Sequence, residues 1–157
     1  MYVALKYELL YNNAKKSGEK QNRQSVRDES TEMEDSMKKR IGLLTSGGDC
    51  QALNATMRGV VKGLSSVEDL EVYGFEDGYK GLIYGKYRML TSRDFSGILT
   101  QGGTIIGTSR QPFKLMRVPD EKGLDKVAAM KQTYYKLCLD CLVILGGNGT
   151  QKPANLL

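Results

Sequence analysis

Histidine is absent from the 157-residue chain, and cysteine and proline occur only three times each. Without histidine, an imidazole general base is excluded within the chain. Three cysteines without a framework spacing argue against a disulfide-stapled secreted domain and favour a reducing compartment. No apolar run approaches the roughly 18 residues that a membrane span needs. We therefore expect a cytoplasmic protein that has no membrane partner.

The chain also lacks a strong block of charge of one sign. Its net charge of +5 is spread along the sequence, and its length suits one modest domain. Charge alone therefore does not suggest binding to nucleic acid, and we expect no nucleic-acid partner. A mildly basic surface also suits phosphorylated small molecules.

Glycine is nearly missing from the beginning of the chain. Only Gly18 precedes position 41, and residues 12–40 contain no aromatic and four apolar residues. Such a segment cannot bury enough apolar surface to offset the entropy lost on ordering. We therefore expect residues 1–37 to be a disordered or weakly helical N-terminal extension, in which residues 2–11 could form a short amphipathic helix.

From Arg40 onward the pattern of apolar residues becomes regular. Short apolar runs closed by glycine turns alternate with segments of helical spacing, which predicts a doubly wound α/β domain with a parallel sheet. Ligands of such domains bind at the carboxyl ends of the strands. The expected strands are residues 41–45, 70–75 and 142–145. The expected helices are 49–66, 93–100 and 124–138, and Lys131 breaks the apolar stripe of the last one. Residues 76–93 are expected to be loop with a short edge strand.

Three glycine-rich loops have one chemistry in common. Glycine lets backbone amides approach an anion closely, and a following helix adds its positive N-terminal end. Arg110 can make forked contacts to phosphate oxygens, and Thr150 can donate a hydroxyl. Each loop alone is more typical of a tight connection, but together they indicate a nucleotide triphosphate held between loops. The loops are residues 46–49, 102–110 and 146–150.

Four motifs, "IGLLTSGGDCQALNATMRGVV", "DGYKGL", "GGTIIGTSR" and "LVILGGNGT", resemble the phosphofructokinase family in order and spacing. The resemblance covers residues 38–157, which correspond to the beginning of the family's catalytic domain. It implies a three-layer phosphofructokinase-like domain and an ATP-dependent 6-phosphofructokinase of bacterial type, a glycolytic kinase. Such an enzyme transfers the γ-phosphoryl group of MgATP to the 1-hydroxyl of fructose 6-phosphate, and the full-length form is expected to be a homo-tetramer.

The resemblance also implies roles for individual residues. Mg²⁺ is the implied cofactor, and Asn148 stands where the family usually has a metal-organising aspartate. Arg58 and Lys62 match basic residues of the bacterial effector site. The implied ATP contacts are Gly48, Tyr79, Arg110, Gln111, Gly147, Asn148, Gly149 and Thr150.

The family's catalytic aspartate is expected beyond Leu157, so we assign no catalytic residue within the chain. On this hypothesis the sheet is truncated after its third or fourth strand. Two alternatives stay open, namely a pyrophosphate-dependent phosphofructokinase and a catalytically inactive fragment with at most nucleotide binding. Pyrophosphate-using members tend to carry an aspartate where this chain has Gly149, and a carboxylate there would crowd and repel the α-phosphate of a nucleotide. Gly149 therefore favours ATP.

Overall fold

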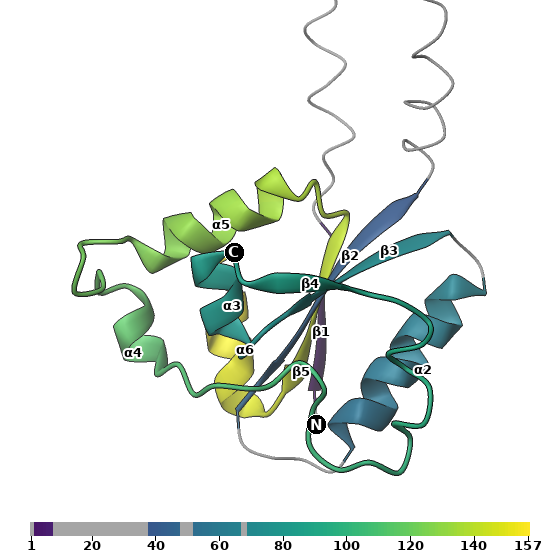
Figure 1. Ribbon diagram of the computed structural model, residues 1–157. Coiled ribbons are helices and arrows are strands. Elements are labelled where there is room, and N and C mark those ends of the chain that lie inside the picture. Colours follow the sequence, from purple (N-terminus) through teal and green to yellow (C-terminus); the bar gives the residue numbers. More distant parts are fainter. Residues whose placement is uncertain (1, 8–37, 48–51, 67–68) are drawn as a thin grey trace, which may run out of the picture.

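The structure, a computed structural model, describes residues 2–7, 38–47, 52–66 and 69–157. They form a five-stranded sheet with the order β1-β5-β2-β3-β4 (Figure 1). The three central strands are parallel to one another, whereas β1 and β4 run antiparallel at the two edges. The α/β class is confirmed, but the sheet is mixed rather than wholly parallel. The strands are β1 (Tyr2–Tyr7), β2 (Lys39–Ser46), β3 (Leu70–Phe75), β4 (Tyr87–Leu90) and β5 (Cys141–Gly146).

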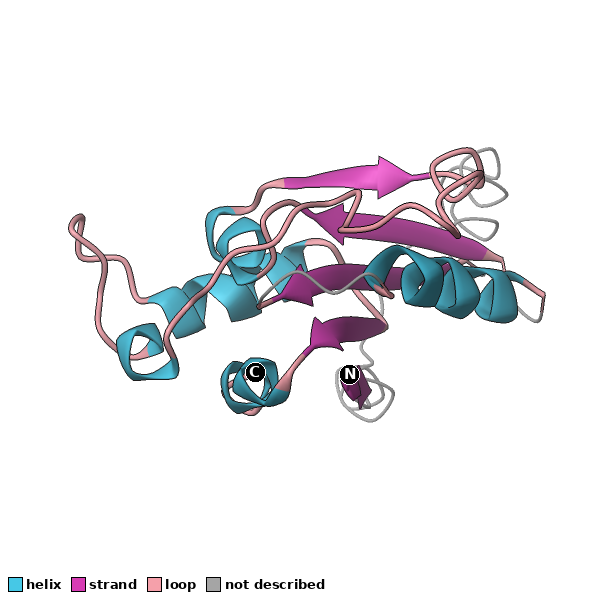
Figure 2. Ribbon diagram, turned by 90° about the horizontal axis from the view of Figure 1, so that it is seen from below, coloured by secondary structure: helices cyan, strands magenta, loops and turns pink. Residues whose placement is uncertain are grey.

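Helices cover both faces of the sheet, which confirms the three-layer arrangement. Figure 2 shows α2 on one side of the strands and α3 and α5 on the other. All six positions of β5 are buried, because helices cover both faces of the sheet. This burial explains why the strand is an almost continuous apolar run. The helices are α2 (Leu53–Ser65), α3 (Tyr79–Tyr84), α4 (Phe113–Met116), α5 (Lys126–Lys136) and α6 (Asn148–Ala154). Within the described ranges, no helix combines the length and apolarity needed to cross a bilayer.

Helix α5 is shorter than predicted, and its buried face is rotated. The Asp125 side chain caps its first turn by accepting hydrogen bonds from the amides of Val127 and Ala128. Met130 and Tyr134 are buried in the core, while Lys131, which was predicted to break the apolar stripe, is exposed. The rotation removes the conflict of a lysine on the buried face.

Residues 2–7, part of the segment expected to be disordered or weakly helical, form an edge strand. Tyr2 pairs with Gly146 and Tyr7 with Cys141, so β1 runs antiparallel along one edge of β5. A strand edge offers unpaired backbone donors and acceptors, and their pairing outweighs a weak local preference for helix. Residues 8–37 lie outside the described part of the chain.

The helix predicted over residues 93–100 is also not formed, and this segment consists of turns. Gly97 adopts a φ of +75°, a left-handed conformation that interrupts a helix. Conversely, α3 was not predicted. It begins after Gly78 (φ +65°) and ends at Gly85 (φ +65°), and its six residues are too few to show a helical period. The edge strand expected within residues 76–93 is confirmed as β4.

Candidate nucleotide-phosphate site

The first and third glycine loops lie side by side because β2 and β5 are neighbouring parallel strands. Ser46 is the register partner of Gly146 at their carboxyl ends. The buried hydroxyl of Thr150 donates a hydrogen bond of 3.1 Å to the Ser46 carbonyl. A Cβ added at Gly146 would lie 2.3 Å from that carbonyl oxygen, so only glycine permits this close approach. The two loops therefore share one backbone junction.

The second glycine loop docks on the same junction through threonine side chains. The buried Thr45 hydroxyl donates to the Gly107 carbonyl at 2.7 Å and lies 2.9 Å from the Thr104 hydroxyl. The Thr108 hydroxyl donates to the Gly47 carbonyl at 2.9 Å. All three loops thus meet at the carboxyl edge of the parallel strands, which is where α/β sheets bind ligands.

The segment that follows β3 forms a further wall of this edge. The Asp77 amide donates to the Ile106 carbonyl at 2.9 Å, and the Ser109 hydroxyl donates to the Asp77 carbonyl at 2.5 Å. A Cβ at Gly78 would lie 2.3 Å from the Thr45 carbonyl oxygen. Asp77 itself has a φ of +54°, which is uncommon for a residue other than glycine. Its exposed carboxylate belongs to the edge at which the loops meet.

Several of the predicted ATP contacts are exposed. Gly147, Asn148 and Gly149 are open to solvent at the start of α6, and Arg110 is exposed at the end of the second loop. No heavy atom lies within 4 Å of a Cβ added at Gly147 or Gly149, so packing does not require glycine at either position. Gly48, together with Asp49, lies outside the described residues.

Other predicted contacts are partly or fully covered. Tyr79 has no exposed surface, and its hydroxyl donates to the Thr150 carbonyl at 2.7 Å, so it supports the third loop from the core. Burial raises the pKa of Tyr79. Thr150 is buried, and its hydroxyl is already used by Ser46. Gln111 is half-buried and lines a hollow of about 520 Å³ beside Tyr84 and Leu115.

The predicted effector residues lie on α2. The guanidinium group of Arg58 donates to the Phe95 carbonyl, which ties the helix to the turn after β4. Lys62 is exposed one turn further along the helix. The two predicted effector residues therefore lie on one helix, and Arg58 links that helix to the turn after β4.

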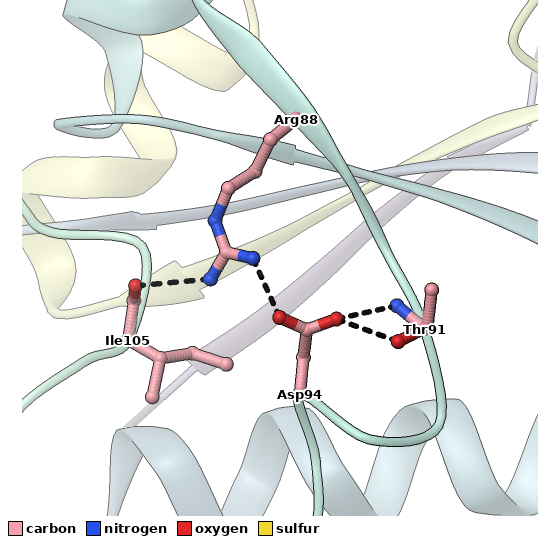
Figure 3. Close-up of polar contacts among 4 residues, drawn as sticks. All are labelled: Arg88, Thr91, Asp94 and Ile105. Atoms are coloured by element: carbon pink, nitrogen blue, oxygen red, sulfur yellow. Dashed lines mark hydrogen bonds and ion pairs between the residues drawn. The ribbon is translucent and has the colours of Figure 1, made fainter.

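An ion pair fastens the same turn to the second loop (Figure 3). Arg88 contacts the Asp94 carboxylate at 2.6 Å and donates to the Ile105 carbonyl at 3.5 Å. Asp94 also accepts from the Thr91 amide at 2.7 Å and the Thr91 hydroxyl at 2.9 Å. These bonds from Thr91, together with Arg88, hold the pKa of Asp94 at about 2.

Sequence reasoning missed Thr45, Asn54, Asp77 and Arg88. A signal existed for Asn54, a polar residue on the otherwise apolar buried face of α2. Its contacts with the second loop are hydrogen bonds to three backbone groups. Arg88 carried no comparable signal, because Ile105 lies 17 positions away and Asp94 lies in a turn that was expected to be helix.

The described residues include no group of three or more histidine, cysteine, aspartate or glutamate side chains that could hold a metal ion. Magnesium in phosphoryl-transfer sites needs only one or two protein ligands, because waters and substrate phosphates supply the others. The exposed side chain of Asn148 can offer an amide oxygen to the ion or to one of its waters. The available donors therefore fit a magnesium ion carried mainly by a bound nucleotide.

The fold and its loops define an α/β protein with a glycine-rich edge at the carboxyl ends of parallel strands. The family model for phosphofructokinase matches residues 40–157, and the chain belongs to this family.

Named relatives agree with this membership. The ATP-dependent 6-phosphofructokinase of Spirochaeta thermophila is 54% identical over 124 residues, which cover 74% of this chain and 33% of that protein. The ATP-dependent 6-phosphofructokinase 3 of Bacteroides thetaiotaomicron is 47% identical over 116 residues, which cover 73% of this chain and 34% of that protein. The crystal structure of Pichia pastoris phosphofructokinase in the T-state has a TM-score of 0.63 and 34% identity, over 76% of this chain and 12% of that chain. The chain spans about a third of the length of the curated relatives.

Proposed function

We propose that the three glycine loops bind the phosphates of ATP and form the nucleotide part of an ATP-dependent 6-phosphofructokinase. The observation that carries the proposal is the meeting of the loops around Ser46 and Gly146, with Arg110 and the start of α6 exposed beside them. Family membership and the names of the relatives support the reaction type. The whole protein would transfer the γ-phosphoryl group of ATP to fructose 6-phosphate, in a cytoplasmic homo-oligomer.

The roles of the residues follow from their chemistry. Backbone amides at Gly147 and Gly149 would donate to phosphate oxygens, and Arg110 would contribute a forked, charged donor. Bound magnesium supplies positive charge that offsets the charge on the phosphates. Asn148 would hold the ion through its amide oxygen, directly or through a water molecule. Tyr79 and Thr150 would keep the third loop in place from the core side, through their buried hydrogen bonds.

The space beside Gly149 favours ATP over pyrophosphate. Glycine places no carboxylate here to repel the α-phosphate of a nucleotide, and a Cβ at this position would meet nothing within 4 Å. Pyrophosphate-dependent phosphofructokinase remains the second candidate, and nucleotide binding without turnover is the third. These alternatives differ in the ligand that the chain binds and in whether transfer occurs.

Calorimetric titration of the chain with MgATP and with magnesium pyrophosphate tests the proposal. We expect saturable binding of MgATP, weaker binding of pyrophosphate, and a loss of about ten- to hundredfold in ATP affinity in Arg110→Ala, since a charge-assisted contact contributes roughly 1.5–3 kcal/mol. Lys136→Ala is the matched control, because this exposed lysine ends α5 five residues before the amino end of β5, whereas the loops follow the carboxyl ends of the strands. Equal losses in both variants, or preferred binding of pyrophosphate, would contradict the assignment.

A further inference from the structure

The loop that carries Arg110 has little regular structure to hold it. Between Gln101 and Gly107 the backbone forms neither helix nor strand. The local backbone hydrogen bonds run from the Gln101 amide to Ile98 at 3.2 Å and from the Gly107 amide to Thr104 at 3.3 Å. The peptide groups between them, most of them exposed or half-buried, take their partners from side chains, from other segments or from water.

One side chain supplies three of those partners. Asn54, the second residue of α2, has no exposed surface. Its amide nitrogen donates to the carbonyls of Gln101 at 3.0 Å and Gly102 at 3.3 Å. Its amide oxygen accepts from the Ile105 amide at 2.9 Å. In Figure 1 the segment after β4 runs alongside α2, as this set of contacts requires.

This set of bonds needs a carboxamide. The two carbonyls require donors and the Ile105 amide requires an acceptor, and an asparagine side chain offers two N–H groups and one oxygen on a single plane. Aspartate of the same shape keeps the acceptor but lacks the donors. Ile105 is additionally held at its carbonyl by Arg88, at 3.5 Å (Figure 3). The amide and the carbonyl of Ile105 are thus both hydrogen-bonded to side chains, the amide to Asn54 and the carbonyl to Arg88.

We propose that Asn54 is a positioning residue that sets the conformation of residues 101–105 and so presents the second glycine loop, with Arg110, to the nucleotide phosphates. The inference rests on the proposed function for its consequence in binding. Asn54 does not need to touch the ligand. A loop that must be ordered at the moment of binding lowers affinity, whereas a loop held in advance does not.

The test is the ratio of the MgATP dissociation constants of Asn54→Asp and the native chain, measured from pH 8 to pH 5.5. At pH 8 the carboxylate faces two carbonyl oxygens, and we expect affinity to fall about tenfold, the equivalent of one or two lost hydrogen bonds. Burial raises the pKa of a carboxyl group, so the aspartate is expected to take up a proton within this range. The protonated group can then donate a hydrogen bond to one of the two carbonyls. The ratio should therefore fall as the pH is lowered.

Gln132→Glu is the matched control, because it makes the same amide-to-acid change at an exposed position on α5, on the other face of the sheet. Its ratio should stay near one at every pH. A folded Asn54→Asp chain with unchanged affinity, or with a loss that does not depend on pH, would overturn the positioning role.

A second variant, Asn54→Ser, covers the case in which the aspartate chain does not fold. Its hydroxyl is too short to reach all three partners, so hydrogen exchange at the Ile105 amide should accelerate at least tenfold while amides of β5 keep their protection. Unchanged exchange at Ile105 would overturn the inference. If the native chain binds no MgATP, the proposed function fails, and the exchange rate of Ile105 alone decides the role of Asn54.

Discussion

Replacing Gly146 by alanine tests the junction on which the site depends. The added methyl group would lie 2.3 Å from the Ser46 carbonyl oxygen and 2.4 Å from the Thr150 hydroxyl. Ordinary contacts are about 1 Å longer, and one of these atoms is backbone, so β2 and β5 must separate locally. Overpacking of this kind costs roughly 1–3 kcal/mol, and weakening the bond between Thr150 and Ser46 adds up to about 1 kcal/mol. We expect Gly146→Ala to lower the free energy of unfolding by about 3 kcal/mol.

Gly149→Ala is the matched comparison within the same loop. Nothing lies within 4 Å of its added methyl group, and alanine in a helix is favoured over glycine by up to about 1 kcal/mol. Urea unfolding followed by circular dichroism should therefore show Gly146→Ala destabilised and Gly149→Ala unchanged or slightly stabilised. The reasoning is refuted if Gly146→Ala is as stable as the native chain or if Gly149→Ala is the weaker of the two. Because the methyl group of Gly149→Ala points into open space, reduced MgATP affinity in this stable variant would support a phosphate contact.

Two further predictions concern the polar contacts around the loops. The Thr91 amide and Arg88 lower the pKa of Asp94 from 3.8 to about 2, so its ionised form stabilises the fold above about pH 4 and this contribution is lost as the pH falls toward 2. The stability difference between the native chain and Asp94→Asn, measured by urea unfolding, should therefore be present at pH 6 and shrink by pH 2.5. A difference that does not change with pH would count against stabilisation of the ionised carboxylate by Thr91 and Arg88. Tyr79→Phe removes the 2.7 Å bond to the Thr150 carbonyl and should lower the free energy of unfolding by about 1 kcal/mol, whereas an unchanged unfolding midpoint would show that this bond contributes nothing.

The central strands could be predicted from sequence because burial on both faces leaves a strong signal. β5 is an unbroken apolar run, and β2 ends in a glycine turn, so their existence follows from composition alone. Their placement as neighbours does not follow from composition; it comes from tertiary pairing. Residues 2–7 illustrate the limit, because their local pattern favours a helix while the edge of β5 selects a strand. Local propensity is a weak preference that such pairing can override.

The candidate site shows a similar division. The glycine-rich loops after strands, with Arg110 in the second loop, led to the prediction of an anion site, and the resemblance to phosphofructokinases drew attention to Gly149. The supporting contacts were not predictable, because Thr45, Asn54 and Ser109 act on backbone groups more than 30 positions away. The contact of Tyr79 with ATP, implied by the resemblance, stays a prediction. The structure adds a role that the sequence did not indicate, because the Tyr79 hydroxyl donates to the Thr150 carbonyl within the core.

The proposed function requires that the three loops act together on one bound phosphate chain. Amide chemical shifts followed by nuclear magnetic resonance during a MgATP titration test it most directly. The account predicts that the amides of Gly47, Gly103, Gly147 and Gly149 shift together with one dissociation constant, while those beside a separate hollow of about 410 Å³, which Tyr84 and Leu124 line, stay in place. Shifts confined to one loop, or centred on that hollow, would contradict it.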